Sequence, residues 1–295
     1  MMPAGRLAAA VVFAASLAAG MLADRPPAQP QIEIGGYRVL AVDLHTHSSM
    51  WSDGALTPWG LVLEAERQGL DAIAITGHNS VLDGRLGRAF ARAASRVIVL
   101  QGEEILSDPD YHLIAVGVRE RVGFGQRAAD AIDAIHRQGG VAIAAHPIRE
   151  FWRAYDAAAL QRLDGAEICH PLIYGREGVQ QELEAFAARA RVAAIGSSDA
   201  HGVGPMGFCR TFVFVRDATE SGILEALRAR RTVVFGRGGA VYGDPALVRL
   251  AADDARLRDG ARPTRRTGVL DTISRIGGVI GLAGLFVLRG ALQNL

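Results

Sequence analysis

The stretch Val39-Leu40-Ala41-Val42-Asp43-Leu44-His45-Thr46-His47 is an apolar run that ends in two histidines. Its length and apolar character predict a buried strand. His45 and His47 are two residues apart, so both imidazole rings point to the same side of an extended strand. The strand therefore presents a pair of side chains suited to metal binding at its end.

Short apolar runs alternate with amphipathic helical stretches after this strand, which is typical of successive β-α units around a parallel sheet. Thr57-Pro58 begins the first helix and Gly69 ends it. About seven such units follow one another, close to the number that closes a barrel. The expected strands cover 39–44, 72–76, 97–100, 112–118, 141–145, 166–169, 192–195 and 211–215, and the expected helices 58–68, 86–94, 126–138, 177–189 and 220–230.

Composition limits the classes of function. The 295 residues, 49% of them hydrophobic, suffice for one α/β domain with tails. With 32 basic and 31 acidic residues, the formal charge of +1 excludes the strongly basic surface of a duplex-binding protein. Cys169 and Cys209 lack the spacing of a thiolate metal site, and we expect two buried free thiols, with a disulfide as the alternative.

Both ends of the chain are apolar and indicate attachment to a membrane. Residues 7–22 stop at Asp24-Arg25-Pro26-Pro27, which fits either a cleaved signal peptide or a retained signal anchor. Residues 276–288, between two arginines, are shorter than the ~20 residues of a full span, so a spanning, an amphitropic and a packed helix all stay open. Gly277 and Gly281 form a GxxxG pattern that suits helix pairing in lipid.

The membrane topology stays open as well. If residues 276–288 span the membrane from outside to inside, Arg262, Arg265 and Arg266 lie on the side that the positive-inside rule disfavours. We expect an exported or membrane-anchored protein with its catalytic domain outside the cytoplasm. The expected divisions are a signal peptide or anchor over 1–23, a linker over 24–36, a metallohydrolase barrel over 37–240, a loop or tail over 241–270 and a possible membrane-associated helix over 271–295.

Metal-binding residue types fall at the ends of the predicted strands. Strand ends of a parallel sheet meet at one face, where the active sites of such folds lie. A structural role is common for one histidine, but independent structural roles for the whole set are not a credible explanation. Imidazoles and carboxylates without thiolates suit two or three Zn, Mn or Fe ions. The residues are His45, His47, His78, Glu104, His112, His146, Asp199 and His201.

Five ordered motifs make a family resemblance specific. They are Asp43-Leu44-His45-Thr46-His47-Ser48 with Ser52-Asp53-Gly54, Ile75-Thr76-Gly77-His78-Asn79, Gly102-Glu103-Glu104, His146-Pro147 and Ser198-Asp199-Ala200-His201. In this order they resemble the motifs of the polymerase and histidinol phosphatase (PHP) family of metal-dependent phosphoesterases. The resemblance covers about residues 39–235.

This resemblance implies a distorted (β/α)7 barrel of the PHP type with a trinuclear site at the carboxyl ends of its strands. One departure from the family pattern is Gly77, where an acidic residue is usual, which puts the third ion in doubt. Asp43 is expected to orient a histidine without binding metal. By analogy, His45, His47 and Asp199 hold the first ion, Glu104 bridges to a second ion held by His112 and His146, and Asp53, His78 and His201 hold the third.

The function implied is hydrolysis of a phosphomonoester, a nucleotide or a short oligonucleotide end by metal-activated hydroxide. Glu104 and Asp199 take part through the metals, and Arg149 is placed to bind a substrate phosphate. His170 lines the pocket or has a structural role. The expected partners are a small phosphorylated substrate and the membrane, not a nucleic-acid duplex. The alternatives are an ester or carbamate hydrolase with the same site, or a non-catalytic metal-binding membrane module.

Overall fold

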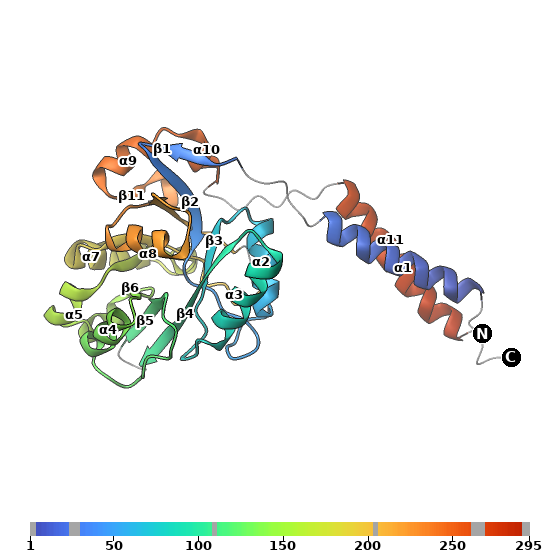
Figure 1. The fold of residues 1–295 in the computed structure, drawn as a ribbon, viewed down its shortest axis with the longest axis horizontal. Helices are drawn as coiled ribbons and strands as arrows, with labels where there is room; N and C mark the ends of the chain where they lie inside the picture. Colours follow the sequence, from blue (N-terminus) through green and yellow to red (C-terminus); the bar gives the residue numbers. More distant parts are fainter. Residues whose placement is uncertain (1–3, 24–29, 108–110, 203–205, 261–268, 291–295) are drawn as a thin grey trace. The chain divides into compact units, whose positions relative to one another are not determined.

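The chain divides into two compact units in the computed structural model (Figure 1), which describes residues 4–23, 30–107, 111–202, 206–260 and 269–290. One unit comprises residues 1–28 and 265–295 and contains the helices α1 (Ala4–Ala23) and α11 (Val269–Gly290). The other unit, residues 29–264, is a mixed α/β domain. All of the predicted site residues belong to this α/β domain.

The α/β domain is built on a strongly curved sheet whose strands follow the order β11-β10-β9-β2-β3-β4-β5-β6-β7-β8, with β1 beside β2. Neighbouring strands are parallel with these exceptions. β5, β9 and β11 are antiparallel to their neighbours, and β1 is antiparallel to β2. This nearly closed sheet confirms the expected distorted barrel. The strands are β1 (Ile32–Ile34), β2 (Tyr37–Asp43), β3 (Ala72–Ile75), β4 (Ile98–Ser107), β5 (Tyr111–Val116), β6 (Val141–Ala144), β7 (Gly165–Cys169), β8 (Ala193–Gly196), β9 (Thr211–Val215), β10 (Thr232–Phe235) and β11 (Val241–Gly243).

A side chain links the two sides of the barrel where β8 meets β9. Thr211 Oγ1 accepts a hydrogen bond from Gly196 N and donates one to Gly196 O, both at 2.8 Å. A Cβ atom on Gly196 would lie 2.7 Å from the carbonyl oxygen of Cys209, so glycine permits this close approach. The ends of β8 and β9 are thereby held together, and because β9 pairs with β2, the late and early parts of the chain meet at one site.

Alternate residues of the strands fill the barrel interior, because successive side chains of a strand point to opposite faces. Helix α8 (Glu220–Arg228) closes the interior with Ile223, Ala226 and Leu227, which are fully buried against the strand residues. The inward-facing strand residues of this cluster include Leu40, Val42, Ala72, Ala74, Leu100, Ile114, Val141, Ile143, Ala193, Ile195 and Val213.

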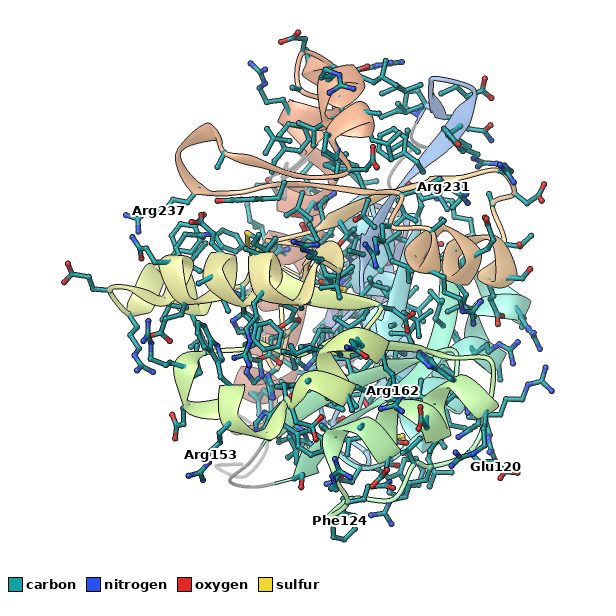
Figure 2. The ribbon with its side chains drawn as sticks, turned by 90° about the vertical axis from the view of Figure 1, so that its left-hand side faces the viewer. Glu120, Phe124, Arg153, Arg162, Arg231 and Arg237 are labelled. Carbon is teal, nitrogen blue, oxygen red and sulfur yellow. A yellow bond between two sulfur atoms is a disulfide. The ribbon has the colours of Figure 1, made fainter. Side chains whose placement is uncertain are left out.

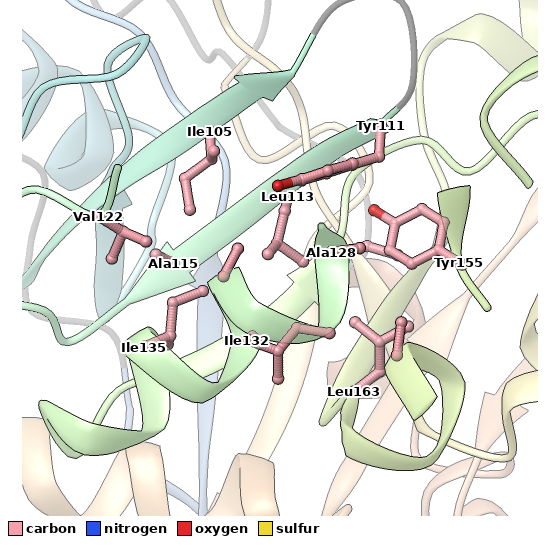
Figure 3. Packing of buried hydrophobic residues seen from close by; sticks show 14 of the residues in the cluster. Ile105, Tyr111, Leu113, Ala115, Val122, Ala128, Ile132, Ile135, Tyr155 and Leu163 are labelled. Carbon is pink, nitrogen blue, oxygen red and sulfur yellow. The ribbon is translucent and has the colours of Figure 1, made fainter. Parts of the chain in front are cut away.

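Helices cover the outside of the sheet (Figure 1). Thr57 caps α2 by accepting a hydrogen bond from Gly60 N, as its N-cap position predicts. Figure 3 shows α4 packing Ile132 and Ile135 against the β4–β5 hairpin, where Leu113 and Ala115 are fully buried. The covering helices are α2 (Pro58–Arg67), α3 (Leu82–Ala94), α4 (Ala128–Arg137), α5 (Ala157–Arg162), α6 (Leu172–Gly175) and α7 (Val179–Ala190).

Charged side chains stand on the outer surface of this helical layer, among them Glu120, Arg153 and Arg162 in Figure 2. Most buried side chains of the domain are apolar, and many of the buried polar ones gather at the carboxyl ends of the strands. Buried polar groups need partners, because removing them from water is costly. The concentration of buried polar residues at one end of the barrel therefore marks a site with a function other than packing.

The stretch 241–270, expected to be loop or tail, instead contains β11 and the helices α9 (Pro245–Ala251) and α10 (Ala255–Gly260); residues 261–268 lie outside the described residues. Leu247, Ala251 and Leu257 are buried in the outer cluster beside β2 and β10, so contacts distant in sequence stabilise these short helices. The expected linker over 24–36 likewise ends in a strand, β1, which pairs with β2. Residues 24–29 lie outside the described residues.

The expectation of two free thiols is wrong. Cys169, at the end of β7, and Cys209, just before β9, form a disulfide with their Cα atoms 5.5 Å apart. The two cysteines are 40 residues apart in sequence, and only the closure of the barrel brings them together. A spacing rule cannot detect such a pair, because the decisive proximity arises from the fold.

Candidate metal centre

The structure brings all nine predicted ligands to the carboxyl ends of the parallel strands, in overlapping groups. His45 and His47 follow β2, His78 follows β3, and Glu104 lies on β4. His112 faces Glu104 from the antiparallel neighbour β5. The remaining ligands lie in loops, Asp53 after β2, His146 after β6, and Asp199 and His201 after β8.

The first group consists of His45, His47, Glu104 and Asp199. His45 Nε2 lies 3.2 Å from Glu104 Oε2 and 3.3 Å from Asp199 Oδ1. His47 Nε2 lies 3.5 Å and 3.0 Å from the same two oxygens. A tetrahedral zinc ion with bonds of about 2.0–2.1 Å holds its ligand atoms about 3.3 Å apart, so this group has the spacing of a metal site.

Glu104 joins the first group to a second, because its other oxygen points to two further histidines. Glu104 Oε1 lies 3.2 Å from His112 Nδ1 and 3.3 Å from His146 Nε2. This carboxylate is nearly completely buried between the two groups. It is therefore placed to bridge two ions, as the resemblance implies.

The third group is the most open. Asp53 Oδ1 lies 3.2 Å from both His78 Nε2 and His201 Nε2, and 3.9 Å from His47 Nδ1. The side chain of Asp53 is 60% exposed, whereas those of His45 and His47 are fully buried. The centre thus runs from a buried first group to a third group in contact with solvent.

Several ligand atoms fit bound ions because nothing else satisfies them. His45 Nε2, His47 Nε2, His78 Nδ1 and Asp199 Oδ1 are buried and make no hydrogen bond within the described residues. Native proteins rarely leave such atoms unpaired, since each costs about 1–3 kcal/mol. A divalent ion at the first group would supply the missing partners of His45, His47 and Asp199, so the residues present fit metal binding.

The electrostatics of the centre keep the carboxylates ionised. Burial alone would raise the pKa of Asp199 and Glu104, but the neighbouring imidazoles, His45 foremost, hold both pKa values well below their usual range. Burial lowers the pKa of His47 to about 4, although Asp199 and Glu104 oppose this shift. Ionised carboxylates and a neutral imidazole are the forms that bind a metal ion.

Glu167 on β7 is the residue that sequence reasoning missed. Its Oε1 atom lies 3.0 Å from His45 Nδ1, and its other oxygen accepts a hydrogen bond from the backbone of His146. The carboxylate is fully buried, yet His45 and His170 outweigh the burial and lower its pKa to about 2. It accepts the proton of His45 Nδ1 and so turns Nε2 toward the metal position. A charge within the otherwise apolar strand Gly165–Cys169 was the available signal.

Asp43 does not orient a histidine ring, contrary to our expectation. Its carboxylate accepts hydrogen bonds from Ser198 N at 3.1 Å, Ser198 Oγ at 2.5 Å and Gly207 N at 2.8 Å, and a longer one from His45 N. These contacts join the end of β2 to the loop after β8. Asp43 therefore fixes the backbone that carries Asp199, and Glu167 performs the role expected of Asp43.

The space at Gly77 is occupied by another carboxylate. A Cβ atom at Gly77 would lie 3.1 Å from Asp83 Oδ2 and 3.3 Å from Ser52 Cβ. Asp83, from the first turn of α3, is fully buried and accepts a hydrogen bond from Trp51 N. An acidic group thus lies beside the third group, although it comes from a different position in the sequence.

Ser52 connects the residues of the third group. Its hydroxyl lies 3.2 Å from His47 Nδ1 and accepts a hydrogen bond from His78 N at 3.2 Å. It also donates to Asp53 Oδ1 at 3.2 Å. Asp83 contacts the loop after β2 through Trp51 N, and Ser52 within that loop contacts His78 N, so the two residues hold Asp53 opposite His78.

His170 and Arg149 have different surroundings. Nδ1 of His170 accepts a hydrogen bond from Leu172 N, so Nε2 carries the proton and lies 3.3 Å from Asp199 Oδ2. His170 therefore supports a ligand from the buried side. The guanidinium of Arg149 lies over the Trp152 ring, 5.2 Å from its centroid, and its phosphate-binding role stays a prediction.

Two ligands have strained backbones. His146 and Asp199 have φ values of 25° and 48°, in the left-handed region that residues with a Cβ atom rarely adopt. Such conformations cost on the order of 1–3 kcal/mol and persist where the surrounding structure enforces them. Glu167 holds the backbone of His146, and Asp43 holds the neighbour of Asp199.

Comparison with known proteins agrees with this geometry. The PHP-associated family model PHP_C matches residues 181–232. A two-domain protein from Bacteroides vulgatus, which contains a predicted PHP-like metal-dependent phosphoesterase, has a similar structure with a TM-score of 0.60. It is 25% identical to this chain, and the match covers 76% of this chain and 73% of that one. The matched model and this similar structure support a PHP domain in the chain.

A sequence relative extends the comparison to the archaea. An uncharacterized protein of Methanocaldococcus jannaschii is 27% identical over 151 residues, which is 48% of this chain and 86% of the relative. In the present PHP domain, the described His, Asp and Glu clusters support binding of divalent metals, in agreement with the expected class of cofactor. Because the similar structure contains a predicted phosphoesterase, phosphoester hydrolysis is the first reaction to test in this chain.

Proposed function

We propose that this PHP domain is a metal-dependent phosphoesterase acting on a phosphomonoester, a nucleotide or a short oligonucleotide end. The observation that carries the proposal is the set of ligand groups sharing Glu104, with buried ligand atoms that lack hydrogen-bond partners within the described residues. Zn, Mn or Fe ions, two or three per chain, suit these ligands. When bound, such ions polarise a phosphoryl oxygen, activate water and stabilise a leaving oxygen.

Side chains around the ligands hold them in position. Glu167 and Ser52 hold the rings of His45 and His47, and His170 donates to Asp199, so the ligands are fixed before a substrate arrives. The side chains of Cys169 and Cys209 are joined in a disulfide and offer no thiol nucleophile. Hydrolysis by water held at the ligand groups is therefore the reaction that the site favours.

The gradient of exposure indicates how a substrate approaches. The side chains of His201 and Asp53 are partly exposed, whereas the first group is closed off by the barrel. A phosphate entering from solvent meets the third group first. Phe151 stacks on His112 with ring centroids 4.6 Å apart, so an apolar wall flanks the second group. A terminal phosphate on a small or single-stranded molecule fits this approach, and the near-neutral charge of the chain argues against a duplex.

The test combines a substrate screen with metal analysis of the same sample. Full-length protein in detergent is stripped of metal and reloaded with Zn, Mn or Fe. Turnover is measured with an aryl phosphate, nucleoside monophosphates, a 5′- or 3′-phosphorylated oligonucleotide and an aryl ester. We expect phosphoester hydrolysis with two or three ions per chain.

His146→Ala is the diagnostic variant, because it removes a ligand of the second group. We expect at least a hundredfold loss of turnover and one fewer ion per chain. His136→Ala is the matched control, since His136 pairs with Asp164 on the helical layer and contacts no ligand group. Faster turnover of the aryl ester would assign carbonyl hydrolysis instead. Fewer than two ions per chain without phosphoester turnover would favour a non-catalytic module.

A further inference from the structure

The helices α1 and α11 pack against each other along a line of small residues. A Cβ atom on Gly281 would lie 2.6 Å from Phe13 N, and one on Gly284 would lie 3.0 Å from Ala9 Cβ. The same holds for Gly277, whose Cβ would lie 3.5 Å from Ser16 Cβ. The paired residues run in opposite directions along the chain, so the two helices form an antiparallel hairpin. Close approach through glycine is typical of helix pairs in lipid.

The outer faces of this hairpin are apolar and exposed. Val11 on α1 is 59% exposed, and Val279 and Phe286 on α11 are 69% and 65% exposed. A monomer in water rarely leaves apolar side chains of this number on one surface. Further exposed apolar residues on the same two helices are Leu7, Val12, Leu17, Ile273, Ile276, Ile280 and Leu282. The hairpin has small residues between its helices and large apolar residues on its outer faces. A water-soluble helix pair has the opposite arrangement, with large apolar residues between the helices and polar residues outside.

The lengths of the two helices match a bilayer. α1 has 20 residues and α11 has 22. At about 1.5 Å per residue, they extend about 30 Å and 33 Å, close to the thickness of the hydrocarbon core. Within α11, residues 269–286 are long and apolar enough to cross a membrane by themselves. The apolar part of α1 is shorter, covering 5–20.

We propose that α1 and α11 insert together as a transmembrane hairpin and that α1 is retained rather than removed as a signal peptide. Loss of α1 would leave Gly277, Gly281 and Gly284 facing lipid with no packing partner, although they lie on the face that α1 covers. The bilayer is the occupant that fits the outer surface. In the sequence, the barrel follows the carboxyl end of α1 and precedes the amino end of α11. In an antiparallel hairpin these two helix ends lie together, so the barrel lies on one side of the membrane and the chain ends on the other.

The disulfide indicates which side holds the barrel. Cys169 and Cys209 are bonded within the α/β domain, and such bonds persist in oxidising compartments outside the cytoplasm. Arg6 lies in the first turn of α1, on the side of the chain ends, as the positive-inside rule requires of a first helix entering from the cytoplasm. Arg262, Arg265 and Arg266 favour the opposite orientation by that rule, but the first helix usually dominates. We therefore assign the barrel to the outer side.

A cross-linking experiment tests the pairing and the retention of α1 together. Ser16→Cys and Gly277→Cys are introduced into the full chain, because their Cβ separation of 3.5 Å suits a disulfide. A protease site is placed within residues 24–29 and an epitope at each end. After oxidation in isolated membranes and cleavage, the amino-terminal fragment is expected to stay attached to the rest of the chain until a reductant is added. The pair Val11→Cys and Ile276→Cys, both facing outward, controls for random collision.

Two alanine substitutions test whether close glycine packing holds the pair. Gly281→Ala places a methyl group against the Phe13 backbone, whereas the nearest atom to a Cβ on Gly278 is Ser16 Cβ at 3.9 Å. We expect Gly281→Ala to reduce the cross-link several-fold and Gly278→Ala to leave it unchanged. An equal reduction of the cross-link by both substitutions would contradict close packing of α1 and α11 at Gly281. Loss of the amino-terminal epitope from membrane-bound protein would overturn the retention of α1.

Protease protection in intact spheroplasts tests the orientation. We expect added protease to degrade the α/β domain and to spare both terminal epitopes until the membrane is permeabilised. Protection of the domain together with exposure of both epitopes would reverse the assigned side. Epitopes on opposite sides would overturn the hairpin itself.

Discussion

Both nitrogen atoms of the His45 imidazole face carboxylates. Glu167 contacts Nδ1, while Nε2 faces Glu104 and Asp199 at 3.2 and 3.3 Å. Burial alone would lower the pKa of His45, but Asp199, Glu104 and Glu167 raise it well above its usual value. A divalent ion relieves this concentration of charge by displacing a proton. Metal affinity is therefore expected to rise with pH.

Removing the charge of Glu167 tests its role in orienting His45. We expect Glu167→Gln to weaken metal affinity 10–100-fold, because the amide does not draw the proton of His45 to Nδ1 as a carboxylate does. Competition with a chromogenic chelator measures the change. Asp164→Asn is the matched control, since Asp164 pairs with His136 away from the ligand groups. Unchanged affinity in Glu167→Gln would refute the role of Glu167.

A methyl group at Gly77 tests the third ion. We expect Gly77→Ala to displace Asp83 or Ser52, because its Cβ would lie 3.1 and 3.3 Å from their atoms. The third ion, which depends on the loop bearing Asp53, is then lost while two ions remain. Elemental analysis of the purified protein gives the count. Gly175→Ala, which meets nothing within 4 Å, serves as control, and three retained ions in Gly77→Ala would count against the role of this loop.

At the scale of single residues, the sequence predicts the metal ligands better than it predicts the side chains that orient those ligands. The nine ligands fall beside apolar runs in a known order of motifs, so their convergence follows from strand direction. Glu167, Asp83 and Ser52 act through neighbours that are distant in sequence, and the identity of those neighbours depends on the folded loops. Asp43 illustrates the same limit. Its position two residues before His45 suggested a contact with a histidine ring, but its carboxylate accepts hydrogen bonds from the backbone of Ser198 and Gly207 instead.

The β4–β5 hairpin presents two adjacent glutamates to opposite faces. Glu104 points into the metal centre, whereas Glu103 accepts a hydrogen bond from Val122 N on the outer side of the sheet. Burial raises the pKa of Glu103 to about 7, although Val122 N and Arg121 oppose the rise. One strand thus carries a candidate metal ligand and a carboxyl group with a raised pKa in consecutive positions.

The raised pKa of Glu103 predicts a dependence of stability on pH. A carboxyl with a higher pKa in the folded chain holds its proton more tightly there than in the unfolded chain. Between its usual value of 4.5 and about 7, the contribution of Glu103 to the free energy of unfolding therefore falls as pH rises. The fall is on the order of 3 kcal/mol and ends above pH ~7.

Glu103→Gln removes this contribution, so the variant gains stability over the wild type as pH rises from 5 to 8. Urea unfolding at both pH values, with chelator present throughout, measures the difference. A parallel change in both proteins would show that Glu103 is not the titrating group. Glu120→Gln is the control, because Glu120 is exposed.

The elements themselves were predictable where local pattern and tertiary environment agree. The expected strands over 72–76 and 211–215 and the helix over 220–230 match β3, β9 and α8 to within two residues. β10, β11, α9 and α10 were not predicted. Their burial depends on contacts with β2 and β9 that no local pattern encodes.

At the scale of the whole molecule, the disulfide constrains the barrel closure. It joins the end of β7 to the residues just before β9 across 40 residues of sequence, and both cysteines lie in a buried cluster beside α7. Neither cysteine is a metal ligand. The bond therefore acts on folding stability rather than on the chemistry of the centre.

We expect Cys169→Ser with Cys209→Ser to lower the free energy of unfolding of the α/β domain by about 4 kcal/mol, from the loss of loop constraint in the unfolded chain. Urea unfolding monitored by tryptophan fluorescence provides the measurement. A reductant is expected to destabilise the wild type and leave the double variant unaffected. An identical urea midpoint for oxidised wild type and variant would contradict the expectation.

The ligands extend from His45 near the start of the domain to His201 near its last strands, and β2 must pair with β9 before they can meet. An unfinished chain emerging from the ribosome, or passing unfolded through a membrane pore, can assemble no more than part of the centre. If the barrel lies outside the cytoplasm, as we propose, we expect the domain to acquire its metal only after export. The ion supply of that compartment, not of the place of synthesis, would then decide which metal the protein carries.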